Sequence, residues 1–146
     1  MESKEMLNLL ERILERSYVA VMSTVDEAGT PRSRWMTPTT VRGREGFLYT
    51  VTAPHFDKVE QLKKNSVVSW LLQSKALDEV LEVTGKAQII DNPALKSEVL
   101  EAIGGHLTTF WRVNPDETEL VVVETVIEEM TYQEPMKGTK VRTSLK

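Results

Sequence analysis

The chain has 146 residues and a mass of 16.6 kDa, which suits one compact domain. Hydrophobic residues make up 40% and charged residues 27%, so the composition excludes a disordered or fibrous protein. With 18 basic and 22 acidic residues the net charge is -4, which argues against a nucleic-acid partner bound through a basic surface. The absence of cysteine excludes disulfides, thiol catalysis and cysteine-ligated metals.

No stretch approaches the roughly 18 apolar residues of a membrane span, and the N-terminus lacks the basic start and apolar block of a signal peptide. We therefore expect a cytoplasmic protein without membrane contact. We also expect two parts, a folded domain over residues 1–134 and a basic polar tail over residues 135–146.

The first half of the chain predicts a helix and three strands. Apolar residues spaced three and four apart predict a helix over Ser3–Arg16, with Ser3 as its cap. β-Branched and aromatic residues separated by turn residues then predict extended segments at Tyr18–Val25, Pro31–Val41 and Phe47–Thr52. Their short connections favour antiparallel pairing.

The second half predicts two helices and three strands. One helix begins at Pro54 and ends near Asn65, and the other begins at Asn92-Pro93 and ends at Gly104-Gly105. The strands are Val67–Gln73, Val80–Ile90 and Glu119–Tyr132, and Gly85 predicts a bulge or a close backbone approach. The fold class is therefore mainly β (α+β), a closed six-stranded antiparallel barrel with peripheral helices.

Two groups of residues could bind an anion. Arg32 and Arg34 lie two apart in an extended segment and so share a face; they are either solvated charges of an edge strand or ligands of a phosphate. The segment Tyr49–Lys58 runs from a strand end into a helix start, where hydroxyls, a partially positive helix end and Lys58 could form an anion site. Alternatively, Thr52 is a helix cap and Lys58 belongs to a solvated face.

Four short segments in order resemble the pyridoxamine-phosphate-oxidase-like flavoproteins, and most closely their small general stress protein 26 group. The segments are Ser33-Arg34-Trp35-Met36, Tyr49-Thr50 followed by Lys58, Asn65-Ser66-Val67, and Val83-Thr84-Gly85-Lys86-Ala87. The resemblance covers about residues 5–133. It implies an FMN-binding split β-barrel, a homodimer, and FMN at the interface between the subunits.

The resemblance also implies roles for individual residues. Arg34 and Lys58 match the residues that bind the FMN phosphate, and Trp35 and Met36 would lie beside the flavin. The remaining cofactor-binding candidates are the strand residues Tyr49, Thr50, Val51 and Thr52, the turn residues His55 and Phe56, Gln73 of the following strand, and Trp111. Trp111 either covers the flavin ring or is an ordinary core or interface tryptophan.

The resemblance is compatible with more than one activity. The chain is either an FMN-dependent oxidoreductase with an unidentified small substrate or a non-catalytic FMN-binding, redox-sensing stress protein. Authentic pyridoxamine-phosphate oxidases carry a C-terminal Arg-x-His segment that is absent from Lys137–Thr143, so oxidation of vitamin B6 is not expected. A third hypothesis is haem or a deazaflavin in the same barrel, with His106 as an axial ligand to haem.

Other chemistry has weak support in the sequence. The two histidines, His55 and His106, lack carboxylates at ligand-like spacing, so no metal site is expected. Five glutamates are expected on a solvated strand face: Glu117, Glu119, Glu124, Glu128 and Glu129.

Overall fold

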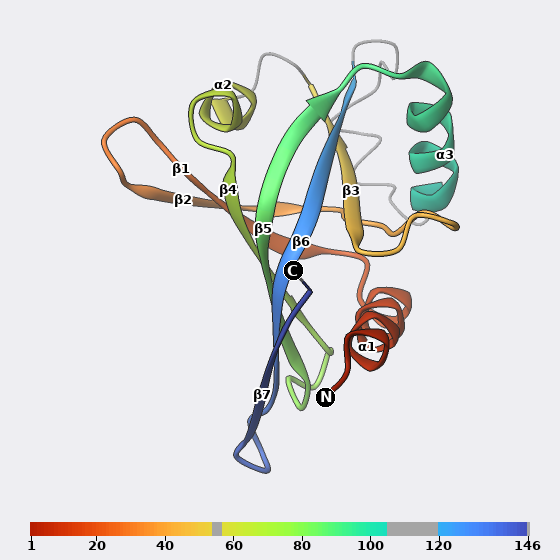
Figure 1. Ribbon diagram of the computed structural model, residues 1–146, viewed down its shortest axis with the longest axis vertical. Helices are drawn as coiled ribbons and strands as arrows, with labels where there is room; N and C mark the ends of the chain where they lie inside the picture. Colours follow the sequence, from red (N-terminus) through yellow and green to blue (C-terminus); the bar gives the residue numbers. More distant parts are fainter. Residues whose placement is uncertain (54–56, 105–119, 146) are drawn as a thin grey trace.

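A computed structural model describes residues 1–53, 57–104 and 120–145 of the chain (Figure 1). Its helices are α1 (Ser3–Arg16), α2 (Asp57–Lys64) and α3 (Pro93–Ile103). Its strands are β1 (Ala20–Val25), β2 (Pro31–Met36), β3 (Phe47–Thr52), β4 (Val67–Gln73), β5 (Val80–Ile90), β6 (Val121–Glu134) and β7 (Thr139–Ser144). Among the described residues, no helix is both long and apolar enough to cross a membrane.

The strands form one antiparallel sheet in the order β2-β1-β4-β5-β6-β3, with β7 also paired to β6. The predicted count of six was wrong, because residues expected in the polar tail form β7. The predicted fold class, a mainly β antiparallel split barrel with peripheral helices, is confirmed; only the closure that the strand pattern suggested is wrong, because the sheet is not closed. An isolated bridge between Thr39 and Tyr49 brings the segment after β2 against β3. The fold is therefore a split barrel.

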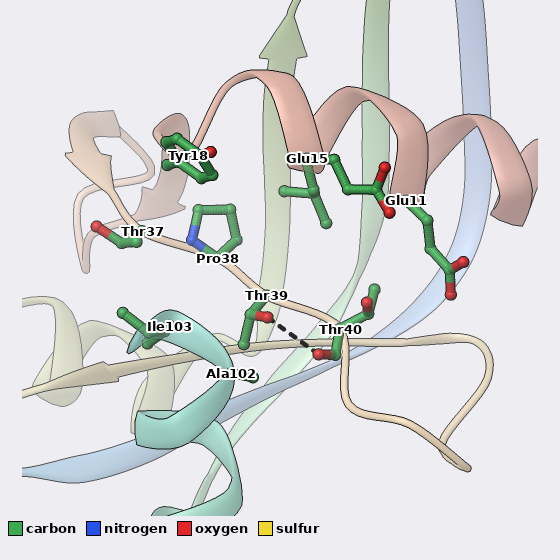
Figure 2. A pocket seen from close by; sticks show the side chains of 10 residues that line it. Glu11, Glu15, Tyr18, Thr37, Pro38, Thr39, Thr40, Ala102 and Ile103 are labelled. Atoms are coloured by element: carbon green, nitrogen blue, oxygen red, sulfur yellow. Dashed lines mark hydrogen bonds between the residues drawn. The ribbon is translucent and has the colours of Figure 1, made fainter. Parts of the chain in front are cut away.

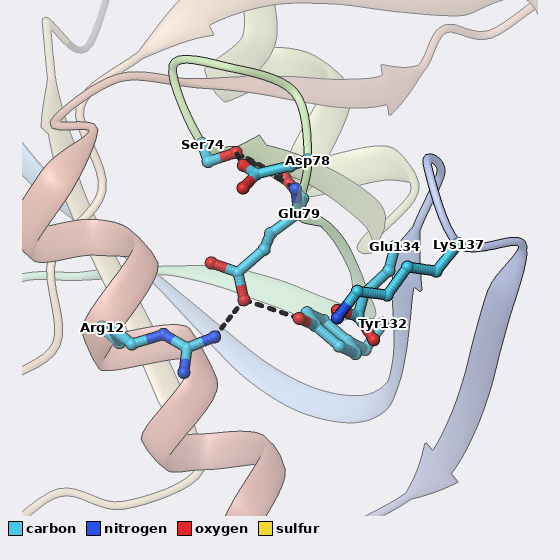
Figure 3. Close-up of polar contacts among 7 residues, drawn as sticks. All are labelled: Arg12, Ser74, Asp78, Glu79, Tyr132, Glu134 and Lys137. Carbon is cyan, nitrogen blue, oxygen red and sulfur yellow. Dashed lines mark hydrogen bonds and ion pairs between the residues drawn. The ribbon is translucent and has the colours of Figure 1, made fainter.

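Helix α1 covers one part of the inner face of the sheet, and its predicted bounds are confirmed. Its cap is Glu2 rather than Ser3, and Glu2 makes no side-chain capping bond, so the expected Ser3 cap was wrong. Figure 3 shows how α1 is attached to the strands: Arg12 pairs with Glu79, which also accepts a hydrogen bond of 2.6 Å from the Tyr132 hydroxyl. This network joins α1, the β4–β5 connection and β6.

The main core fills the inner face, where fully buried side chains from five elements meet. It includes Met6 and Leu10 of α1, Met22 of β1, Trp70 of β4, Leu81 and Val83 of β5, and Met130 of β6. The indole nitrogen of Trp70 donates a hydrogen bond of 3.1 Å to Thr125 Oγ1, so the largest core side chain keeps its polar atom satisfied.

A second core lies where α3 packs on the outer face of β3 and β6. Tyr49 and Val51 of β3 and Val122 of β6 contact the buried side of α3 there. Asn92 caps α3 by accepting a hydrogen bond of 3.1 Å from the Leu95 amide, which confirms the predicted helix start. Both faces of β3 are consequently buried.

The predicted irregularity at Gly85 is confirmed. The register of β5 against β6 shifts between Thr84 and Gly85. A Cβ atom at Gly85 would lie 2.0 Å from the Val126 carbonyl oxygen, so the two backbones are too close for any side chain.

Candidate functional site

Arg34 lies on the inner face of β2 with its guanidinium between β1 and α2. Its cross-strand partner is Met22, a core residue, and cross-strand partners share a face of the sheet. One guanidinium nitrogen donates to the Met22 carbonyl oxygen at 3.4 Å, and the other donates to Gln61 Oε1 at 3.2 Å. Burial lowers the pKa of Arg34 from its ordinary value, but an arginine remains charged at neutral pH.

This cation has no acidic partner among the side chains that the structure describes. The described ion pairs involve other cations, and burial is the cause of the pKa change at Arg34. A half-buried cation without a counter-ion is unfavourable, so an anion bound at Arg34 gains an interaction that the protein itself does not supply.

Arg32 shares the face of Arg34 but has its own counter-ion. Its Nε donates to Asp26 Oδ2 at 3.0 Å. The backbone amide of Thr30 and the Arg32 side chain hold the pKa of Asp26 below its usual range. Residue types alone did not distinguish the two arginines, whereas the family resemblance selected Arg34. The structure separates them by charge pairing, because only Arg32 has an acidic partner among the described residues.

Helix α2 brings Gln61 to Arg34. Its apolar residues Val59 and Leu62 are buried, and Leu62 joins the main core. Lys64 pairs with Glu27 in the turn between β1 and β2. The helix is therefore anchored both to the core and to the hairpin that carries Arg34.

The other predicted phosphate ligand is Lys58, in the first turn of α2 and three residues before Gln61. Positions three apart are neighbours on one side of a helix, so the topology brings the backbone of Lys58 to the side that carries Gln61. The side chain of Lys58 lies outside the described part of the chain, and its contact with a phosphate stays a prediction.

The predicted residues of β3 divide between its two faces. Thr50 and Thr52 lie on the inner face, and Thr50 Oγ1 donates to the Thr37 carbonyl oxygen at 2.8 Å. Tyr49 and Val51 lie on the outer face beneath α3. Thr52 is buried at the end of β3, five positions before α2 begins.

The Tyr49 hydroxyl is engaged within the protein. It donates a hydrogen bond of 2.8 Å to Glu124 Oε2, and burial raises the pKa of Tyr49 to about 12. Glu124 also accepts from Gln88 Nε2 at 3.0 Å and is only 8% exposed. The expectation that Glu124 lies on a solvated face was therefore wrong, because α3 covers this part of the sheet. Glu128 and Glu129 are partly exposed, and Glu117 and Glu119 lie outside the described residues.

Trp35 and Gln73 do not lie on the same face as Arg34. Trp35 is 65% exposed on the outer face, opposite Val21 in the neighbouring strand. Gln73 is half-buried at the far end of β4, also on the outer side, whereas Met36 packs against the main core. A single chain thus brings Arg34 to α2 but does not bring Trp35 and Gln73 to it. The remaining candidates, His55, Phe56, Trp111 and His106, lie outside the described residues.

Two hollows near these elements do not match the predicted site. Figure 2 shows a cavity of about 240 Å³ between α1, residues 37–40 and the end of α3, lined in part by Glu11, Glu15 and Tyr18. Its volume is below the ~300 Å³ at which small-molecule sites usually begin. None of the predicted cofactor-binding residues whose side chains the structure describes lines it.

The second hollow, about 380 Å³, lies between α2 and the β1–β2 turn. Among the described side chains that line it, three are carboxylates, from Asp26, Glu27 and Glu60, and one is a cation, Lys64. Like charges repel, so this lining disfavours a phosphate. Gln61 also lines this hollow and accepts a hydrogen bond from Arg34, which is not among the residues that line the hollow.

Gln61 and Thr24 were not among the predicted site residues. Thr24 Oγ1 donates to Gln61 Oε1, so one carboxamide oxygen accepts from both Thr24 and Arg34. One sequence signal could have identified Gln61 as a site residue: it lies three residues after Lys58, and positions three apart are neighbours on a helix. The partnership with Arg34 spans 27 positions and depends on tertiary packing.

The antiparallel split barrel with peripheral helices defines the structural class. A family model described as pyridoxamine 5'-phosphate oxidase matches residues 6–134. The chain belongs to this family. No protein with a curated description matches the sequence significantly.

Solved structures with the same fold cover nearly the whole chain. A Clostridium acetobutylicum protein related to general stress protein 26 of B. subtilis is 16% identical with a TM-score of 0.76, and the match covers 99% of this chain and 97% of that one. General stress protein 26 from Bacillus anthracis is 23% identical with a TM-score of 0.73 and coverage of 98% and 100%. A Listeria innocua protein described as a putative pyridoxamine 5'-phosphate oxidase is 24% identical with a TM-score of 0.68 and coverage of 87% and 97%.

Proposed function

We propose that the protein is an FMN-binding flavoprotein in which Arg34 and Lys58 bind the phosphate of the cofactor. The observation that carries this proposal is the half-buried guanidinium of Arg34, which has no acidic partner among the described side chains. A planar guanidinium can donate two parallel hydrogen bonds to phosphate oxygens. It therefore binds a phosphate with more defined geometry than a point charge such as an ammonium does. The donor set at this point therefore fits the phosphate group.

The outer face supports the second part of the proposal, a homodimer with FMN between its subunits. Four large apolar side chains are exposed on neighbouring strands or just before them: Val19, Trp35, Val67 and Leu71. Exposed apolar surface of this kind marks an interaction site in a globular protein. A second subunit would cover this surface, and FMN between the subunits would contact Arg34 of one subunit and outer-face residues of the other.

Bound FMN supplies hydride or electron transfer, and the chain supplies binding, orientation and exclusion of water. We propose an oxidoreductase with a small substrate that reaches the flavin between the subunits, near Trp35. Oxidation of pyridoxamine phosphate is not part of the proposal. The alternative is a protein that binds FMN without turnover. We place either form in the cytoplasm.

Other cofactors have some support among structures with this fold. One is described as a heme binding protein from Mycobacterium smegmatis, at 13% identity and spanning 58% of that longer chain, and another as an F420 reductase, at 21% identity. A visible absorption spectrum of the purified protein distinguishes a flavin, a deazaflavin and a haem. Two flavin bands after reconstitution with FMN support the proposal, and a Soret band or a colourless protein after the same treatment contradicts it. Turnover with a reductant then separates an oxidoreductase from a binding protein.

A further inference from the structure

Gln61 is the described side chain on α2 that contacts Arg34, and its carboxamide has a fixed orientation. Thr24 Oγ1 and Arg34 Nη2 both donate to the same oxygen of Gln61. Because a guanidinium can only donate, the carboxamide must present its oxygen to Arg34, and the Thr24 hydroxyl donates to the same oxygen, which leaves the NH₂ group of Gln61 on the other side. That NH₂ group has no acceptor among the described residues.

The neutrality of Gln61 also matters for the charge of Arg34. A glutamate of nearly the same shape at position 61 would accept the same two hydrogen bonds but would neutralise the guanidinium. Glutamine therefore gives Arg34 a hydrogen-bond acceptor on the helix without giving it a counter-ion. Arg34 is held in place by the Met22 carbonyl oxygen on one side and Gln61 on the other, and it retains its full charge for an external anion.

We propose that Gln61 is a positioning and specificity-determining residue for the cofactor phosphate, acting through Arg34. This inference rests on the proposed function. Gln61 links Arg34 of β2 to α2, the helix whose first turn includes Lys58. Its uncharged oxygen lets the site accept a phosphate dianion.

The direct test is Gln61→Glu, with FMN and riboflavin affinities measured by fluorescence quenching. Both donors keep an acceptor in this variant, so circular dichroism and the unfolding temperature should match those of the wild type. FMN affinity should fall by at least about tenfold, because the charge-assisted bond between Arg34 and the FMN phosphate is lost and the introduced carboxylate at position 61 faces the phosphate. Riboflavin affinity should change less than about twofold. Gln133→Glu makes the same substitution on β6, far from α2, and should leave both affinities unchanged.

A double-mutant cycle tests whether Gln61 acts through Arg34. Gln61→Met should weaken FMN binding in the wild-type background and have little further effect when combined with Arg34→Ala. Additive losses would show that Gln61 acts independently of Arg34, and unchanged FMN affinity in Gln61→Glu would show that it has no role in the phosphate site. If wild-type protein binds FMN and riboflavin equally, or neither, the proposed function itself fails and this inference fails with it.

Discussion

Arg32 and Arg34 lie two residues apart on the same face of β2, yet only Arg32 has an acidic partner among the described residues. Asp26 neutralises Arg32 at the exposed hairpin, whereas Arg34 is drawn toward the core beside Met22 and meets an uncharged amide from α2. Arg32 thus stabilises the β1–β2 hairpin, whereas Arg34 remains available to bind a ligand.

Arg34→Ala and Lys58→Ala should each weaken FMN binding by roughly ten- to a hundredfold, because a charge-assisted hydrogen bond contributes roughly 1.5–3 kcal/mol. Isothermal titration with FMN measures the loss. Arg32→Ala, Lys63→Ala and Lys64→Ala are matched controls, since their side chains pair with Asp26, Glu60 and Glu27 respectively. Equal losses in all five variants would mean that general charge, and not this site, governs binding.

Leu71→Glu should convert the proposed dimer into a monomer. Leu71 is 42% exposed on the outer face, beside Val21 and opposite Glu82 of β5, so a carboxylate there would be buried unpaired in the interface. Light scattering at micromolar concentration gives the mass. Leu77→Glu, in the exposed β4–β5 turn, should remain dimeric. A wild-type mass of one chain in the presence of FMN would contradict the proposed interface.

Gly85→Ala should destabilise the fold whether or not a ligand is bound. A methyl group would meet the Val126 carbonyl oxygen at 2.0 Å, so β5 and β6 must separate, at a cost of about 1–3 kcal/mol. Urea unfolding followed by tryptophan fluorescence measures the change. Lys86→Ala, at the exposed neighbouring position, should have an effect within about 0.5 kcal/mol. Similar stability of both variants would show that the strands can move apart freely.

Alkaline pH should destabilise the protein through Tyr49. Burial and the bond to Glu124 raise the pKa of Tyr49 to about 12 in the folded state, against 10.0 for the free side chain. The folded state therefore holds this proton more tightly, and the corresponding stability is complete below pH 10 and declines as the pH rises toward 12. Tyr49→Phe should reduce the slope of the unfolding free energy between pH 10 and 12. An unchanged slope would assign the alkaline transition to other groups, such as Tyr132, whose pKa is also raised to about 12.

The sequence predicted best those elements in which buried residues recur at the regular spacing of a helix or a strand. The alternation in β5 and the helical spacing in α1 are local patterns, and both elements have their predicted bounds. β7 escaped prediction because its residues are polar and mostly exposed, so pairing with β6 leaves no hydrophobic pattern. The buried state of Glu124 could not be seen either, because it depends on the packing of α3 across the outer face.

The sequence named candidate residues for the site but did not indicate how they are arranged. The resemblance to a flavoprotein family identified Arg34 and Lys58, and the structure brings Arg34 to the helix that carries Lys58. The difference between Arg32 and Arg34 depends on Asp26, and the role of Gln61 depends on a contact across 27 positions. The first contact forms within the β1–β2 hairpin and the second through the packing of α2 against β1, and neither leaves a periodic pattern in the sequence.

The most direct test of the central claim is the ratio of FMN affinity to riboflavin affinity for the wild-type protein, measured by fluorescence quenching under identical conditions. The two ligands share the isoalloxazine ring and differ in the phosphate, so the ratio isolates the contribution of the anion site. With Arg34 and Lys58 both bound to the phosphate, FMN should bind at least about a hundredfold more tightly than riboflavin. Equal affinities would contradict the phosphate site and leave Arg34 as a structural residue.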